Sequence, residues 1–136
     1  MRVLVIAMLI MGAVAGCSTH QPFIVAHRAD VTNLQAGPAG PHDRPVRIIE
    51  TDLPGHVAYE RIADVDVARA WYASRDAARV QLAEAARELG ADAVVDARVW
   101  LQPSGFAWAA PHARGVAVRW SNAESARVAA GLGAEF

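Results

Sequence analysis

Residues 85–101, AARELGADAVVDARVWL, join the end of a helix to the start of a strand and decide the fold. Gly90 stands where a glycine in the left-handed conformation commonly ends a helix. Beyond it, small and β-branched residues recur at every second position, as in a strand. One face of that strand would carry Ala93, Val95, Ala97, Val99 and Leu101, and the other Val94, Asp96, Arg98 and Trp100. We therefore predict a helix that ends at Gly90 and a strand over residues 93–101.

Upstream of this stretch, the sequence predicts the helix itself. Ser74 can accept a hydrogen bond from the first turn, and Asp76 favours the positive end of the helix. Apolar residues then recur at helical spacing; they are Ala78, Leu82, Ala85, Ala86 and Leu89. The opposite face carries Arg79, Glu84, Arg87 and Glu88. Because most of the apolar face is alanine, we expect the helix to lie close against a sheet.

Two further strands are predicted before the helix. Residues 46–50 and residues 57–67 have strand patterns, and the turn over residues 53–56 separates them. The second run changes the parity of its apolar positions, which predicts a β-bulge near Ala63 and Asp64.

The last predicted strand, residues 115–120, follows a turn at residues 103–105. One face of this strand would carry Val116, Val118 and Trp120. The order strand–strand–helix–strand–strand predicts an α+β fold, a small and mainly antiparallel sheet with one main helix packed on it.

Cys17 is the only cysteine of the chain, and it follows an apolar N-terminal run over residues 3–15. The junction VAGC resembles the lipobox of bacterial lipoproteins, in which the cysteine becomes the mature N-terminus and carries diacylglycerol and acyl chains such as palmitate. The run fits a signal peptide and is shorter than the ~20 residues of a membrane-spanning helix. Cleavage after Ala15 by ordinary signal peptidase is the alternative, and it would leave Cys17 as a free thiol.

The residue after the cysteine bears on the destination of such a lipoprotein. In lipoproteins of this kind, aspartate at that position favours retention in the inner membrane, whereas this chain has Ser18. The resemblance therefore implies an anchor in the cell outer membrane, with the chain facing the periplasm.

These features divide the chain into four parts. Residues 1–16 are the predicted lipoprotein signal peptide, and residues 17–44, rich in Pro and Gly, are the lipidated N-terminus and a flexible tether. Residues 45–121 form the α+β domain, and residues 122–136 form a C-terminal tail or a short helix. Within the tether, residues 23–25 are apolar, so docking of this short patch as an edge strand is the alternative to a spacer.

Composition excludes some classes of partner. The chain has 13 basic residues, all arginine, and 14 acidic residues, for a formal net charge of −1. It therefore has no basic excess that would indicate binding to nucleic acid or to an anionic membrane surface. With Cys17 acylated the domain can form no disulfide, so packing alone must stabilise it.

The sequence resembles a known family over about residues 46–120. The segments YERIADV at residues 59–65 and AARELGADAVV at residues 85–95 resemble the YbjQ-like domain family, also labelled heavy-metal-binding, and the related Rcs stress-sensor lipoproteins. The resemblance implies the α+β fold and an envelope role. The chain lacks the disulfide cysteines of the Rcs lipoproteins and has Ala63 where a glycine is common, so the match informs the fold more than the function.

Candidate metal ligands and charged clusters are few. The predicted tether contains His20, His27 and His42. His56 in a turn and His112 in the predicted loop before the last strand could meet with Asp52, but no pair has metal-ligand spacing, and we assign no metal ligand. Asp96, Arg98 and Arg119 would project from neighbouring strands, either as a ligand-binding cluster or, as we expect, as ordinary cross-strand pairs.

Aromatic residues are the best candidates for a contact surface. Phe106 and Trp108 lie in a predicted loop that has little structural need for aromatic side chains. Because aromatic residues dominate protein–protein hot spots, we assign these two residues to partner binding, with packing of the loop onto the domain as the alternative. Trp71 and Tyr72, just before the helix, raise the same question.

The sequence as a whole predicts a binding protein of the cell envelope. It contains no Ser-His-Asp arrangement, Gly-rich phosphate loop or nucleotide fingerprint, so we expect neither an enzyme nor a cofactor. We expect a lipid-anchored protein whose periplasmic domain binds an envelope protein in a structural or stress-sensing role. A domain that binds a small ligand or a metal is the alternative, and self-association into a homo-oligomer is a further expectation.

Overall fold

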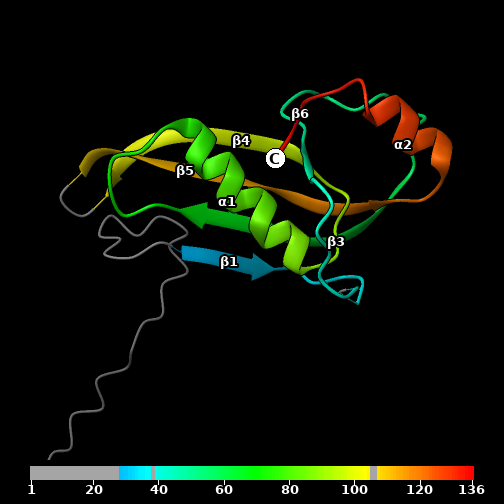
Figure 1. Ribbon diagram of the computed structural model, residues 1–136, viewed down its shortest axis with the longest axis horizontal. Coiled ribbons are helices and arrows are strands. Elements are labelled where there is room, and N and C mark those ends of the chain that lie inside the picture. Colours follow the sequence, from blue (N-terminus) through cyan, green and yellow to red (C-terminus); the bar gives the residue numbers. More distant parts are fainter. Residues whose placement is uncertain (1–27, 38, 105–106) are drawn as a thin grey trace, which may run out of the picture.

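Residues 28–37, 39–104 and 107–136 are described by a computed structural model (Figure 1). They form a six-stranded sheet and two helices, which confirms the expected α+β class. The elements are β1 (Arg28–Thr32), β2 (Arg47–Ile48), β3 (Tyr59–Ala68), α1 (Arg75–Glu88), β4 (Ala93–Ser104), β5 (Ala107–Trp120), α2 (Ala123–Ala129) and β6 (Ala134–Glu135).

The sheet has the strand order β1-β3-β5-β4-β2-β6. All neighbouring strands are antiparallel except β2 and β4, which are parallel. The expected order of four strands around a single main helix is therefore corrected, because β1 precedes this unit and α2 and β6 follow it. Four of the five residues of β1 are exposed, so it lacks the apolar alternation by which strands are found in sequence.

The helix α1 begins and ends where the sequence predicts. The Ser74 side chain accepts a hydrogen bond from the backbone N–H of Ala77 at 3.1 Å. After the last turn, Gly90 has a φ of +72°, and its N–H donates to the carbonyl of Arg87 while that of Ala91 donates to Ala86. This pattern is the Schellman ending that favours glycine.

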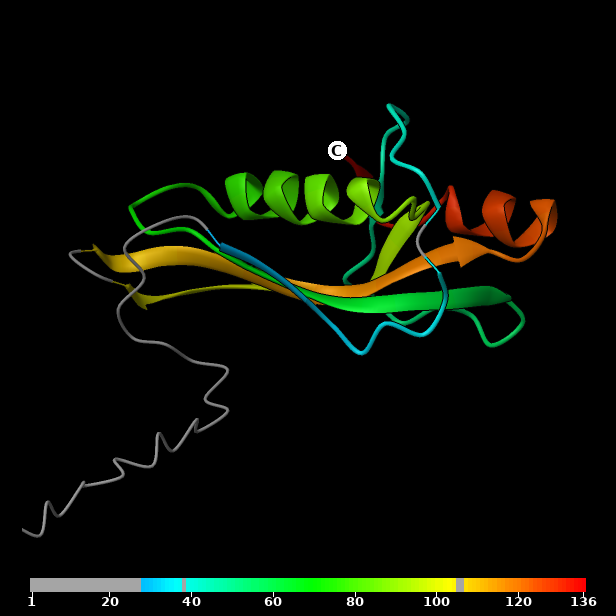
Figure 2. The same cartoon turned by 90° about the horizontal axis from the view of Figure 1, so that it is seen from below.

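The main core lies between α1 and one face of the sheet. Figure 2 shows α1 above the long strands, with no described helix below them there. The buried face of α1 meets buried residues of the sheet; the cluster includes Leu82, Ala86, Ile62, Val65, Val94 and Ala97. The small alanines of α1 allow this close approach, as the sequence predicts.

A second cluster forms around α2 and the C-terminal segment. It includes Ile49, Ala93, Val118 and Ala129. The short helix anticipated within residues 122–136 is α2, and Ser125 in it accepts a hydrogen bond from the N–H of Ala58 at 2.8 Å. The final residue, Phe136, exchanges two backbone hydrogen bonds with Val46, so the C-terminus is part of the sheet.

Two bulges interrupt the long strands. The register of β3 against β5 shifts at Ile62, next to the predicted position. A second bulge in β4 was not predicted: Asp96 and Ala97 stand opposite Gly115, and Asp96 has a φ of +51°. The predicted alternation over residues 93–101 is therefore wrong after Val95.

Several predictions concern residues outside the described part of the chain. These are the signal peptide over residues 1–16, the lipidation of Cys17, the edge strand over residues 23–25 and the role of Phe106. The tether was expected over residues 17–44. In the part of it that the structure describes, the first residues form the strand β1 instead of a spacer. In the described residues, no helix is long and apolar enough to cross a membrane.

Candidate functional site

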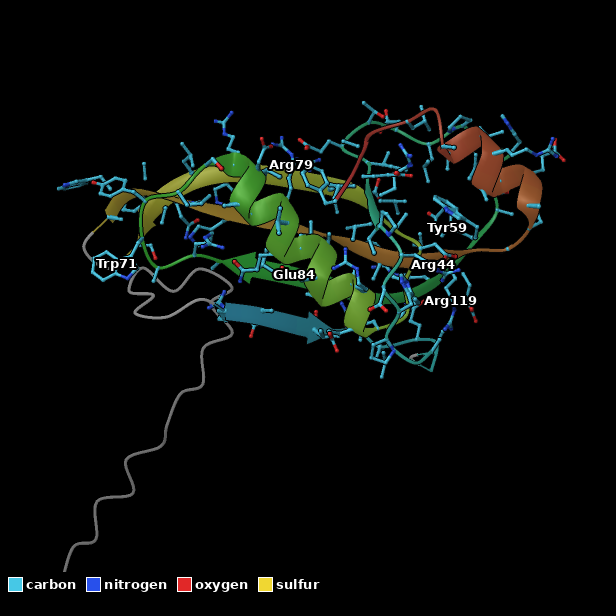
Figure 3. All side chains as sticks on the ribbon, in the orientation of Figure 1. Arg44, Tyr59, Trp71, Arg79, Glu84 and Arg119 are labelled. Carbon is cyan, nitrogen blue, oxygen red and sulfur yellow. The ribbon has the colours of Figure 1, made fainter. Side chains whose placement is uncertain are left out.

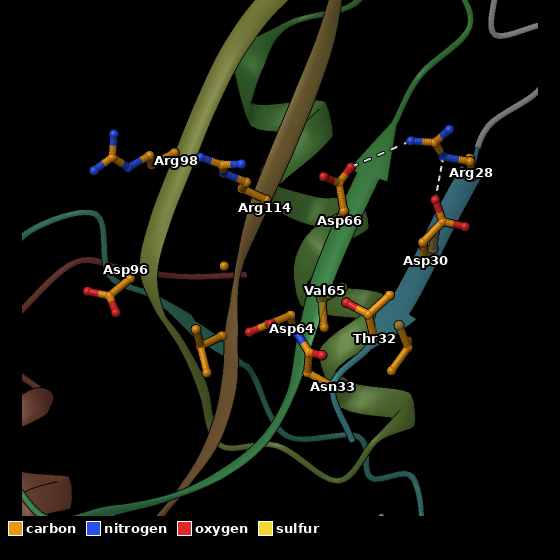
Figure 4. Close-up of a pocket in the computed structure, with 14 residues that line it drawn as sticks. Arg28, Asp30, Thr32, Asn33, Asp64, Val65, Asp66, Asp96, Arg98 and Arg114 are labelled. Carbon is orange, nitrogen blue, oxygen red and sulfur yellow. Dashed lines mark hydrogen bonds and ion pairs between the residues drawn. The ribbon is translucent and has the colours of Figure 1, made fainter. Parts of the chain in front are cut away.

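The sheet face opposite α1 contains a trough of about 940 Å³ (Figure 4). Strands β1, β3, β5 and β4 form its floor and sides. Half of the residues that line it are charged; they are Arg28, Asp30, Asp64, Asp66, Asp96, Arg98 and Arg114. We define this feature as the trough and treat it as the candidate site.

Cross-strand register places the charges in order across the trough. Asp30 on β1 stands opposite Asp66 on β3, Asp66 stands opposite Arg114 on β5, and Arg114 stands opposite Arg98 on β4. Acidic residues therefore occupy the two strands at one end of this row, β1 and β3, and basic residues the two at the other end, β5 and β4.

Three aspartates on the acidic side of the trough have partners within the chain. Arg28 lies between two carboxylates, with Nε 2.6 Å from Asp30 and Nη2 3.8 Å from Asp66. Asp64 forms an ion pair with Arg61 and accepts a hydrogen bond from the side-chain amide of Asn33 at 2.5 Å. These carboxylates therefore already have cationic or polar partners.

The basic side of the trough differs, because two arginines face each other across neighbouring strands. Within the described residues, neither Arg98 nor Arg114 forms an ion pair, and both are exposed. The Arg114 guanidinium carbon lies 5.8 Å from the centre of the Trp100 ring, a cation–π contact. Like charges directly opposite in a ladder destabilise a sheet, which a bound anion would relieve.

An aromatic pair lies beside the two arginines. The rings of Trp100 on β4 and His112 on β5 stack with their centres 5.6 Å apart, and the Trp100 indole N–H donates to Gln102 at 2.7 Å. His112 is buried within β5 and not in a loop, which corrects its predicted position. Trp100 also lines a hollow with Arg98 and Arg114 beside the trough, whereas His112 is buried beneath the surface.

The structure does not bring together the histidines considered for a metal site. His56 lies in the turn before β3, whereas His112 is in register with Ala68 at the opposite end of β3. Among the described residues, no group of three or more His, Cys, Asp or Glu side chains could hold a metal ion.

The alternative of a ligand-binding cluster of Asp96, Arg98 and Arg119 is also not formed. Arg119 forms an ion pair with Glu60 at 3.1 Å and donates to the carbonyl of Gly37, so it is a cross-strand pair as expected. Asp96 and Arg98 do line the same trough, but the structure shows no ion pair between them.

The aromatic candidates lie at one end of the sheet, away from Tyr59 and Arg119 (Figure 3 labels Trp71, Tyr59 and Arg119). Trp108 is 81% exposed, and it lies in β5 and not in a loop, which corrects the prediction. Tyr72 is 61% exposed, and its hydroxyl accepts a hydrogen bond from the Trp108 N–H at 3.0 Å. Trp71, next in the chain to Tyr72, is 54% exposed.

Sequence reasoning missed several charged residues of the trough. Arg114 precedes the predicted last strand, which was expected to begin at Gly115, and Arg28 and its partner Asp30 fall in the predicted tether. Larger residues at positions 112, 114 and 116 alternate with small ones at 113 and 115, and this pattern could have indicated that β5 begins before Gly115.

Comparisons with known proteins do not assign this site. The chain matches no protein-family model, and searches of curated proteins and of solved structures find no match to it. The resemblance described above therefore depends on residues 59–65 and 85–95 alone.

Proposed function

We propose that this chain is a lipid-anchored protein of the bacterial envelope whose domain binds an acidic segment of a partner protein in the trough. The observation that supports the binding site most directly is the pair formed by Arg98 and Arg114, which are opposite in register and without ion pairs in the described residues. The VAGC junction at Cys17 supports the anchor.

The chemistry of the arginine pair favours a carboxylate. A guanidinium presents a planar fork of N–H donors that matches the two oxygens of a carboxylate. Two such groups on adjacent strands can hold one or two acidic side chains, and binding removes the repulsion between them. The aspartates on β1 and β3 already have Arg28 and Arg61 as partners, whereas Arg98 and Arg114 form no ion pair within the described residues.

The size of the trough favours an extended segment over a single small ion. Its volume of about 940 Å³ lies in the upper part of the range for ligand sites, and it spans four strands. The ring of Trp100 beside Arg114 offers an apolar contact next to the charged one. An acidic segment with neighbouring apolar side chains would use both.

The first prediction tests the arginine pair. In cells, the double change Arg98→Gln and Arg114→Gln should reduce crosslinking of the epitope-tagged chain to its partner at least about tenfold, since each lost charge-assisted contact weakens binding. Arg127→Gln on α2, which removes an exposed arginine far from the trough, is the matched control and should retain capture. Equal capture by both variants would exclude this site.

A small-ligand function remains the second candidate, because a free anion could occupy the same two arginines. Titration of the purified chain with succinate and with inorganic phosphate, observed through the arginine Nε–H resonances in NMR, separates the two. If the Arg98 and Arg114 resonances shift and saturate at ligand concentrations below about 1 mM, the result would favour a small-ligand protein over a peptide-binding one.

The second prediction tests the anchor. Cys17→Ala should move the protein from the membrane fraction to the soluble periplasmic fraction, or leave an uncut precursor, because the acylated thiol is the proposed attachment. Fractionation and the mass of the mature chain measure both outcomes. Unchanged membrane association with normal processing would contradict lipidation at this residue.

A further inference from the structure

Three exposed aromatic side chains lie together at one end of the sheet. Trp108 and Tyr72 are joined by the hydrogen bond from the Trp108 N–H to the Tyr72 hydroxyl, and Trp71 adjoins Tyr72 in the chain. We define Trp71, Tyr72 and Trp108 as the aromatic tip. Trp and Tyr combine an apolar ring with a polar group, and they are enriched where membranes meet water.

The segments that bear the aromatic tip contain no acidic residue. Residues 99–111, which run through the end of β4 and the start of β5, include no charged side chain at all. Residues 69–75 include only two charged residues, Arg69 and Arg75. A surface of this composition is apolar at its centre with arginines beside it, which suits phosphate headgroups above an acyl layer.

The aromatic tip and the start of β1 lie at the same end of the sheet. Arg28, the first residue of β1, is in register with Ala68, and Ala68 is in register with His112 (Figure 1). From His112 to the start of β5 at Ala107 the strand advances about 17 Å. Fully extended, residues 17–28 span at most about 40 Å. An anchor at Cys17 is therefore close enough for the tip to reach the bilayer.

We propose that the aromatic tip docks into the interfacial layer of the phospholipid bilayer that holds the anchor. This inference rests on the proposed lipid anchor, and it assigns to Trp108 a lipid contact in place of the protein contact expected from sequence. Lipid is favoured over protein because the tip lies on the anchored side of the domain, and because neither segment that bears it offers an acidic group for a polar interface.

The test supplies the tether chemically, so that it does not depend on lipidation in cells. Because Cys17 is the only cysteine, the thiol of the full chain can be coupled to a maleimide lipid in vesicles of phosphatidylcholine and phosphatidylglycerol at about 3:1. Lipids with brominated acyl chains then quench the fluorescence of tryptophans that enter the bilayer. We expect quenching of the full chain, and loss of at least half of it in the double variant Trp71→Ala with Trp108→Ala.

Controls separate docking from unfolding and from failure of the anchor. Trp120→Phe, at the opposite end of β5, should leave the quenching unchanged, and the double variant should keep its circular dichroism spectrum because both rings are exposed. Equal quenching of the double variant, or none in the full chain, would overturn the proposal. So would loss of the crosslinked protein partner upon the same two changes, which would make the tip a protein interface. Unchanged fractionation of Cys17→Ala would contradict only the anchor in cells.

Discussion

Replacing Leu82 with alanine is expected to lower the free energy of unfolding by about 3 kcal/mol. Leu82 is fully buried on the face of α1 that packs against the sheet. Its neighbours in the helix include Ala78, Ala83 and Ala86, which are too small to fill the space that the leucine side chain would leave. The loss therefore combines the transfer of buried methyl groups to water with an unfilled cavity.

The measurement is chemical or thermal unfolding of the purified chain, monitored by circular dichroism. A loss of this size should lower the melting temperature by roughly 10–20 °C in a domain of this length. Val80→Ala is the matched control, because Val80 lies two residues away on the exposed face of the same helix and should change stability by less than about 0.5 kcal/mol. Similar losses for the two variants would mean that α1 does not pack on this face.

The sequence predicted the parts of the fold in which local signals and packing agree. The helix from Ser74 to Gly90 has a polar cap, an apolar face and a terminal glycine, and each of these features has the same role in the structure. The strand after Gly90 was predicted because its small and β-branched residues enter a buried sheet. Asp92 within this stretch accepts a hydrogen bond from the N–H of Trp120 at 3.0 Å, a structural role that was not predicted.

The rest of the fold could not be predicted because it depends on long-range pairing. β1 is exposed along most of its length and is held through its ladder with β3. The bulge at Asp96 depends on Gly115, a residue on another strand. The positive φ of Asp96 does not change the alternating pattern of residue types in the sequence. The faces of β4 were therefore assigned incorrectly after Val95.

The candidate site was predicted only in part for the same reason. The exposure of Trp108 was anticipated from an aromatic residue in an apparent loop, although the residue lies in a strand. The trough was not anticipated, because its row of charges joins Asp30, Asp66, Arg114 and Arg98 from four strands. Only the register of the sheet brings these residues together.

The two proposed surfaces are compatible with one orientation of the domain. The aromatic tip lies at an end of the long strands, whereas the trough lies on the sheet face opposite α1. A domain that rests on the bilayer through its tip would leave the trough open at its side to a partner in the periplasm. Substitutions in the arginine pair should therefore reduce partner capture, whereas substitutions in the aromatic tip should reduce lipid contact.

The bulge that shapes the trough leads to the last prediction, that Gly115→Ala destabilises the domain by about 2–3 kcal/mol. Gly115 lies in the centre of the sheet, opposite Asp96 and Ala97. A Cβ at this position would lie 2.4 Å from Cγ1 of Val94 and 3.0 Å from the carbonyl oxygen of Val95. Val94 is buried and β-branched, so its side chain cannot rotate away without strain. Strand β4 would have to move, and the bulge with it.

Unfolding of Gly115→Ala is measured against Gly131→Ala, whose added Cβ would have its nearest neighbour at 3.7 Å and should cost less than about 0.5 kcal/mol. A second comparison identifies the clash itself. In a chain that already carries Val94→Ala, the Cγ1 atom is absent, so the same change at Gly115 should cost clearly less than in the unmodified chain. An equal cost in both backgrounds would show that contact with Val94 is not the cause. Because the displaced strand carries Arg98, weaker partner capture by Gly115→Ala would connect the packing of this glycine to the trough.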